Sequence, residues 1–161
     1  LCKHQRRVFY GNNLFSKGAC YAAKEKTEER NLKGYLYVGN DLVRENVGME
    51  MTVFGTPAYP PLIVSGVNWY EAMGDCEIIL DDTRELEFVV SDMENTGKVR
   101  YSMPLPGLPD RPAKATRLHI HLEFTAADEC RIDVTDMGFG DLYPSSNLTW
   151  HETMKSRGAE E

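Results

Sequence analysis

Apolar and polar residues alternate strictly in one part of the chain, over residues 118–124. The apolar members are Leu118, Ile120, Leu122 and Phe124, and the polar ones between them are His119, His121 and Glu123. This period of two is typical of a strand with one buried face, and it returns over residues 130–135. The small, acidic segment 125–129 between the two runs predicts a hairpin loop. Because the hairpin has one apolar face, the rest of the chain must supply a second layer that covers it.

Further short strands are predicted along the chain. Extended or alternating apolar runs occur at residues 47–53, 62–64, 77–80, 86–90 and 98–103, and Asp, Gly and Pro cluster between them. With the central hairpin, these runs predict a mainly β fold, an antiparallel β-sandwich of about seven or eight strands. One helix is also expected, because Asn12 or Asn13 can cap a run of good helix formers that reaches about Arg30.

The sequence divides into four predicted parts. They are an N-terminal helical segment over residues 1–34, an apolar linker over 35–41, a β-sandwich domain over 42–150 and a flexible tail over 151–161. The linker contains the apolar run Tyr-Leu-Tyr-Val between polar flanks. The tail is assigned as flexible because polar chain ends commonly fray.

Composition narrows the classes of partner. The 161 residues have a net charge of −7, and their 18 Lys and Arg form no dense stripe. This argues against a nucleic-acid partner, whose phosphates require clustered basic residues. No apolar run approaches the length that spans a bilayer, so no membrane partner is expected either. The expected partner is a protein, a peptide or a small molecule.

Four widely spaced cysteines give information about the cellular compartment in which the protein is found. They are Cys2, Cys20, Cys76 and Cys130, and none of them lies in a CxxC motif. The pattern favours free thiols in a reducing cytoplasm, with a disulfide pair or a metal site as the alternatives. The sequence begins at Leu1, with neither Met nor a signal peptide, so we expect a cytoplasmic fragment of a longer protein.

One pair of residues could carry metal chemistry. His119 and His121 lie on one face of the predicted strand, at the spacing that lets two imidazoles reach one metal ion. Glu123 continues that face, and a neighbouring strand could bring Asp133 to it. The alternative is that both histidines face solvent on the polar side of a sheet. No serine or cysteine has the neighbours that an activated nucleophile needs, so no catalytic residue and no cofactor are predicted.

Five segments, taken in order, resemble the DnaK-type heat-shock chaperones. They are GACYAA at residues 18–23, YLYV at 35–38, VGMEM at 47–51, LIVSG at 62–66 and PLPGLPDRPAKATRLHIHLEFTAADECRIDV at 104–134. They are similar to the last helix of the actin-like nucleotide-binding domain, the interdomain linker, and the strands and closing hairpin of the peptide-binding β-sandwich. The resemblance implies an uncharacterised bacterial relative, in which residues 1–34 are the remnant of an upstream nucleotide-binding domain. Two departures from the family are a longer, proline-rich loop after Met51 and the lack of a helical lid after Trp150.

The resemblance also implies a peptide-binding cleft. The positions that match its apolar lining are Met49, Met51, Ile78, Ile79, Leu86 and Phe88. A peptide would lie across them in extended form, with one apolar side chain in a pocket. The alternative is that all six residues are ordinary core, because alternate apolar residues of a two-layer β fold point inward.

Three functions follow from these observations. The first is a non-enzymatic, chaperone-like binding module that engages an extended peptide or a segment of a partner protein. The second is a structural or regulatory β-domain that packs on its own nucleotide-binding half or on another subunit. The third is a metal-binding site at His119 and His121.

Overall fold

The computed structural model describes residues 14–27, 41–93 and 97–155, and the chain divides into two units, Leu1–Tyr37 and Val38–Glu161. In the first unit the predicted helix is confirmed as α1 (Leu14–Thr27). Its predicted cap lies outside the described residues, and so do residues 35–40 of the predicted linker. Among the helices that the structure describes, none is long and apolar enough to cross a membrane.

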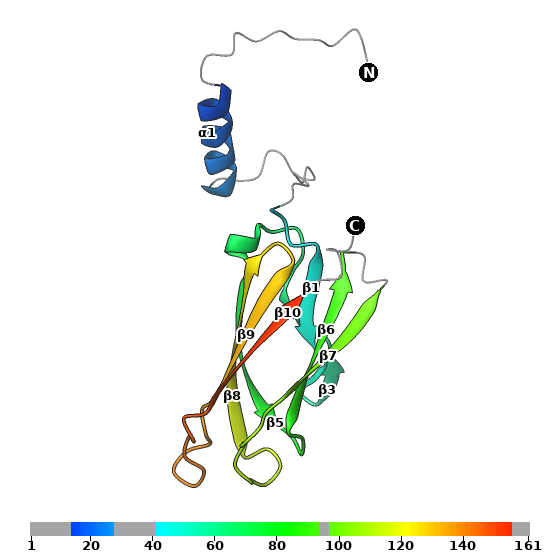
Figure 1. The fold of residues 1–161 in the computed structure, drawn as a ribbon, viewed down its shortest axis with the longest axis vertical. Helices are drawn as coiled ribbons and strands as arrows, with labels where there is room; N and C mark the ends of the chain where they lie inside the picture. The colour runs from blue at the N-terminus through cyan, green and yellow to red at the C-terminus, as the bar shows by residue number, and fades with distance from the viewer. Residues whose placement is uncertain (1–13, 28–40, 94–96, 156–161) are drawn as a thin grey trace. The chain divides into compact units, whose positions relative to one another are not determined.

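The second unit contains three antiparallel sheets (Figure 1). The first sheet has the order β4-β1-β6-β7 and consists of β1 (Glu45–Met49), β4 (Pro61–Ile63), β6 (Glu85–Asp92) and β7 (Lys98–Pro104). The second has the order β10-β9-β8-β5 and consists of β5 (Met73–Leu80), β8 (Thr116–Ala126), β9 (Glu129–Asp136) and β10 (Thr149–Lys155). A hairpin of β2 (Met51–Val53) and β3 (Thr56–Ala58) and a short 3₁₀ helix, η2 (Trp69–Glu71), complete the unit. The predicted antiparallel sandwich is confirmed, with ten strands in the described residues in place of seven or eight.

The central hairpin forms as the alternation predicts. In β8 the apolar side chains are buried while His119, His121 and Glu123 between them stay half-exposed. β8 continues to Ala126 and β9 begins at Glu129, so the loop is shorter than the predicted segment 125–129. Strand pairing therefore extends through the residues that the sequence assigned to the turn.

The expected boundary of the sandwich at residue 150 is wrong. β10 runs to Lys155 and pairs with β9 in antiparallel register, from Thr149 opposite Thr135 to Lys155 opposite Glu129. The side chains of Trp150 and Met154, both on this strand, are buried in the core. Residues 151–155 are therefore part of the sandwich and not a flexible tail. Residues 156–161 of the predicted tail lie outside the described part of the chain.

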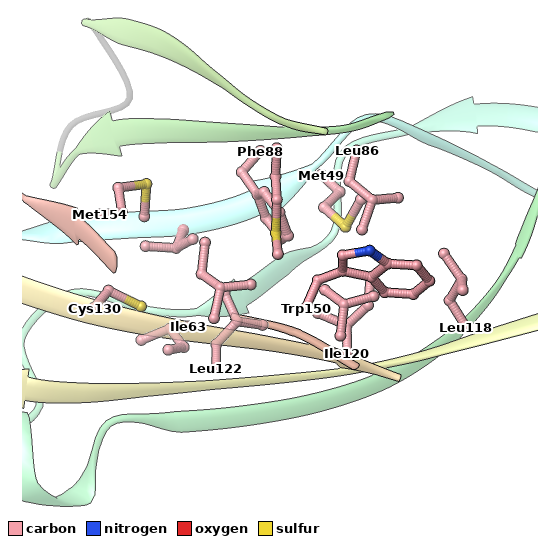
Figure 2. Close-up of a cluster of buried hydrophobic side chains, with 14 of the residues drawn as sticks. Met49, Ile63, Leu86, Phe88, Leu118, Ile120, Leu122, Cys130, Trp150 and Met154 are labelled. Carbon is pink, nitrogen blue, oxygen red and sulfur yellow. The ribbon is translucent and has the colours of Figure 1, made fainter. Parts of the chain in front are cut away.

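The core lies between the two four-stranded sheets. Figure 2 shows Phe88 and Leu86 of one sheet and Leu118, Ile120 and Leu122 of the other pointing into the same space. The indole of Trp150 lies among them, and its Nε1 donates a hydrogen bond of 2.9 Å to the carbonyl oxygen of Pro106. Because this polar group is satisfied, the large ring can be buried at little cost.

The two sheets approach each other closely along one side, where β4 lies beside β5. Gly74 on β5 permits this approach, because a Cβ at that position would stand 2.5 Å from the carbonyl oxygen of Leu62 on β4. The opposite side is formed by β7 and β10, which are the edge strands of their sheets. The sandwich is thus closed at β4 and β5, and the candidate site lies at the other side.

Candidate functional site

The structure does not gather the six predicted peptide-binding residues on one accessible face. Met49, Leu86 and Phe88 are buried in the core, where Figure 2 shows them between the sheets. Met51 and Ile78 are half-buried and pack against that core, whereas Ile79 is 55% exposed. The alternative that these positions are ordinary core therefore fits Met49, Leu86 and Phe88, whose side chains have no free surface for a peptide.

The predicted histidine pair lies on the outer face of β8. Nδ1 of His121 is 2.8 Å from Oδ1 of Asp75, and Nε2 of His119 is 3.4 Å from the same oxygen. The hydrogen bond to Asp75 raises the pKa of His121, although partial burial opposes the shift. In the part of the chain that the structure describes, no group of three or more His, Cys, Asp or Glu is arranged to hold a metal ion.

A surface cavity of about 260 Å³ opens between the edge strands β7 and β10. It is lined by Glu45, Val90, Ser91, Asp92, Gly97, Lys98, Val99, Tyr101, Met154 and Lys155. Its apolar lining comes from three strands, with Val90 on β6, Val99 and Tyr101 on β7, and Met154 on β10. These residues meet because the two sheets do not cover each other fully on this side. The cavity therefore reaches the core at the buried side chain of Met154.

Polar groups at the cavity are held in defined positions. The carboxylate of Asp92 accepts a hydrogen bond of 3.0 Å from the backbone N–H of Gly97, which joins the end of β6 to the residue before β7. The ammonium of Lys98 lies 4.8 Å from the ring centre of Tyr59, within the range of a cation–π interaction. Burial, and secondarily the charge of Glu152, raises the pKa of Tyr101, so its hydroxyl stays neutral and can donate a hydrogen bond.

A second cavity, of about 290 Å³, lies among the loops that join β5 to β6 and β7 to β8. Asp81, Asp82, Arg84 and Asp110 contribute to its lining, and Arg84 pairs with Asp110 at 2.9 Å. Both members of that pair are largely exposed, so the pair contributes little to stability, and little apolar surface is offered there beyond Leu80 and Leu108. The cavity between β7 and β10 is thus the better candidate for a binding site.

The buried carboxylate in the described residues is a structural group. Burial alone would raise the pKa of Asp136, but hydrogen bonds from Arg111, Ser146 and the backbone of Gly138 lower it well below its usual range. Both of its oxygens are engaged, with Arg111 donating at 2.8 Å to each of them. A carboxylate so stabilised is a weak base, so it is poorly suited to acid–base catalysis.

The thiols of Cys130 and Cys76 are not activated. Burial, and secondarily Glu123, raises the pKa of Cys130 to about 12. Burial, followed by the charge of Asp75, also raises the pKa of Cys76. Nucleophilic cysteines require a lowered pKa, and these two show the opposite shift.

Sequence reasoning missed the residues of the cavity. The strand that carries Val99 and Tyr101 was predicted, but nothing local indicates that its edge lies beside the end of the chain. Met154 fell in the predicted tail. The only sequence feature that pointed to a strand here was the spacing of Trp150 and Met154, two large apolar residues four positions apart. The polar Glu152 lies midway between them, where a regular alternation would have an apolar residue.

Comparison with known families gives two matches. Residues 42–156 match a family described as Domain of unknown function (DUF8552), and residues 1–40 match one described as Family of unknown function (DUF5716) C-terminal. No curated protein matches the chain.

These matches overturn the resemblance to the DnaK-type chaperones, because neither matching family is a chaperone family. The assignment of residues 1–34 to a nucleotide-binding domain was part of that resemblance and falls with it. The segments that suggested it are alternating apolar strands and proline-rich connections. Any antiparallel sandwich requires such segments, so they do not identify one family.

Proposed function

The chain belongs to the DUF8552 domain family, and we propose that its sandwich is a non-enzymatic binding module for an extended segment of a partner protein. The observation that carries the proposal is the apolar cavity between β7 and β10. The partner segment would lie along this open side and place one apolar side chain in the cavity.

The size of the cavity supports a side chain as its occupant. Pockets for drug-sized ligands usually measure roughly 300–1,000 Å³, whereas this one measures about 260 Å³. Val90, Val99 and Met154 offer apolar surface, which gains from the burial of an aliphatic or aromatic side chain. We therefore expect recognition of a single apolar residue in a longer segment.

The strands on either side of the cavity support an extended backbone. Within the described residues, β7 pairs only with β6, and β10 pairs only with β9. Each edge strand thus has backbone N–H and C=O groups on its free side, and an added strand is a common partner for such groups. Main-chain hydrogen bonds would hold the segment, and the cavity would select its anchor residue.

In this proposal the binding module acts in the reducing environment of the cytoplasm. Cys20, Cys76 and Cys130 are free thiols, and such thiols persist where disulfides do not form.

A peptide selection tests the proposal. A library of random 12-residue peptides would be selected against the full chain, and the dissociation constant of each enriched peptide would be measured by fluorescence anisotropy. Val99→Asp places a charge in the cavity, and Val53→Asp is the matched control, because the two valines are 37% and 38% exposed and Val53 lies on the separate β2–β3 hairpin. We expect Val99→Asp to weaken binding at least tenfold and Val53→Asp to leave it unchanged.

Two results would contradict this function. One is the failure of the library to yield any peptide that binds saturably. The other is equal affinity of the enriched peptides for Val99→Asp and for the unchanged chain. Circular dichroism of both variants shows whether the sandwich remains folded, so that loss of binding is not confused with loss of structure.

A further inference from the structure

Ionisable residues form an ordered row across the outer face of the β10-β9-β8-β5 sheet. Asp75 on β5 is paired in register with His121 on β8, His121 with Asp133 on β9, and Asp133 with His151 on β10. Side-chain contacts follow the row, with 2.8 Å between Asp75 and Nδ1 of His121 and 2.5 Å between Asp133 and Nδ1 of His151. The row therefore alternates carboxylate, imidazole, carboxylate, imidazole.

In the neighbouring row the acidic and basic residues exchange places on the two central strands, β8 and β9. It consists of Met73, Glu123, Arg131 and Thr153, which are register partners on β5, β8, β9 and β10. Arg131 pairs with Glu123 at 2.6 Å. In the first row β8 carries the imidazole and β9 the carboxylate, whereas in the second β8 carries the carboxylate and β9 the guanidinium. The centre of this face is thus a chequered pattern of charge.

We propose that this face is self-complementary and that two copies of the chain associate through it. Consider a two-fold axis that is parallel to the strands and lies midway between β8 and β9. It places β8 of one copy over β9 of the other, and β5 over β10. In both rows each carboxylate then lies over a basic group of the second copy. The facing pairs are Asp75 with His151, His121 with Asp133, and Glu123 with Arg131.

This arrangement matches the row pattern better than an axis that runs across the strands. An axis across the strands between the two rows would place Asp75 over Met73 and His151 over Thr153, which leaves both outer charges unmatched. The axis along the strands matches every ionisable group of these two rows and gives an isologous contact that closes at the dimer. Packed sheets are twisted by about 30° relative to each other, so the pairs nearest the axis stay best aligned. Those pairs are formed by His121, Glu123, Arg131 and Asp133.

The association depends on pH through the imidazoles. Several charged groups face them on this sheet. Asp75 contacts both His119 and His121, and Glu77 lies opposite His119. Glu123 lies 3.7 Å from His121, while Arg131 contacts Asp133 at 3.2 Å and Arg117 contacts Glu77 at 3.6 Å. The pKa of His121 is raised, chiefly by its hydrogen bond to Asp75, and protonation of this imidazole as the pH falls adds positive charge opposite Asp133 of the second copy. Dimerisation is therefore stronger at pH 5.5 than at pH 7.5, and added salt weakens it.

Two charge reversals test the geometry. Glu123→Arg alone and Arg131→Glu alone each place like charges opposite each other in a homodimer, so each variant is expected to dimerise at least tenfold more weakly. In an equimolar mixture, the two basic side chains of one variant lie over the two acidic side chains of the other. The mixture is therefore expected to form a heterodimer. Sedimentation velocity of the full chain at pH 5.5 and low salt measures all three cases.

A matched control lies on the outer face of the other sheet. Arg100→Glu reverses an arginine that is ion-paired with Glu50 and Glu87, and it is expected to leave dimerisation unchanged. A wild-type chain that stays monomeric up to millimolar concentration overturns the proposal. So does a dimer that survives either single reversal, or a mixture of the two variants that stays monomeric. None of these outcomes bears on peptide binding at the cavity, because the cavity opens between β7 and β10 toward the core, whereas the dimer would form on the outer face of the β10-β9-β8-β5 sheet.

Discussion

Arg111 and Asp136 form a buried ion pair, in which two parallel hydrogen bonds of 2.8 Å join the guanidinium to the carboxylate. Their side chains are only 5% and 0% exposed. Ser146 donates to the same carboxylate through its backbone N–H at 2.8 Å and also through its hydroxyl. The pair therefore ties the connection after β7 to the end of β9 and to the segment that leads into β10. The pair thus helps to position the start of β10, whose other end contributes Met154 to the cavity.

Arg111→Ala is expected to be strongly destabilising. Removal of one partner leaves a buried carboxylate without its counter-charge, which costs roughly 3–5 kcal/mol of unfolding free energy. Arg84→Ala is the control, because the Arg84–Asp110 pair is exposed and such pairs contribute about 1 kcal/mol or less. Urea unfolding followed by circular dichroism measures both. Equal losses in the two variants would show that the buried pair has no special role.

Stability is expected to fall with acid partly because of Asp136. Its pKa in the folded state is depressed, so its contribution is present above the unfolded-state pKa of about 3.9 and is lost as the pH falls below that value. Asp136→Asn removes the contribution at every pH. The difference in unfolding free energy between the unchanged chain and Asp136→Asn should therefore shrink between pH 6 and pH 2.5. A difference that stays constant over this range contradicts the assignment.

Phe88→Ala and Ile79→Ala distinguish core from surface among the residues first expected to line a cleft. Phe88 is fully buried, and its truncation is expected to cost about 3–5 kcal/mol. Ile79 is more than half exposed, and its truncation is expected to stay within about 0.5 kcal/mol. Thermal unfolding at constant protein concentration gives the comparison. A small loss in Phe88→Ala would mean that the space between the sheets is not closely packed.

Phe54 occupies an unfavourable position at the tip of the β2–β3 hairpin. Its φ is 50° and that of Gly55 is 82°, the two positive values of a type I′ turn, and its side chain is fully exposed. Phe54→Asn creates the Asn-Gly pair that this turn prefers and should raise the unfolding free energy by up to about 1 kcal/mol. Gly55→Ala, at the next position, should lower it by a similar amount. If Phe54→Asn is destabilising, the aromatic side chain makes a contact that the isolated chain does not show.

The described cysteines are expected to differ in how readily their thiols are alkylated. Cys20 is exposed on α1, whereas Cys130 is buried with its pKa raised to about 12. We expect iodoacetamide at pH 8 to alkylate Cys20 in the native chain and Cys130 only after denaturation. Peptide mapping by mass spectrometry identifies the modified positions. Rapid native labelling of Cys130 would indicate that the sandwich opens near the start of β9.

The predictability of the fold follows the strength of the local pattern. β8 could be predicted because its four apolar residues alternate without a break over residues 118–124. β3 could not, since Pro57 in a segment flanked by glycine and prolines indicates a loop, and only pairing with β2 makes it a strand. β10 has two buried apolar residues, Trp150 and Met154, separated by Glu152, which is too weak an alternation to identify a strand.

The candidate site was beyond sequence reasoning for a different reason. Val99, Tyr101 and Met154 come together because β7 and β10 lie at the same side of the two sheets, which is a property of the topology. The alternation of apolar residues in the sequence indicates which side chains face inward, but it does not indicate which sheet edges lie side by side. The same limitation explains the misleading chaperone resemblance, because the matching residues describe how a sandwich is built and not which sandwich it is.

Gly74 on β5 also affects the arrangement of the sheets at the opposite side of the sandwich. The absence of a side chain there sets the separation of the sheets where β4 and β5 meet, since any added Cβ would collide with the backbone of Leu62. Gly74→Ala would force the layers apart at that side and change their tilt. We expect this change to alter the width of the cavity between β7 and β10, because the same two sheets form both sides. A glycine outside the cavity would thus act as a spacer that helps to set the shape of the binding site.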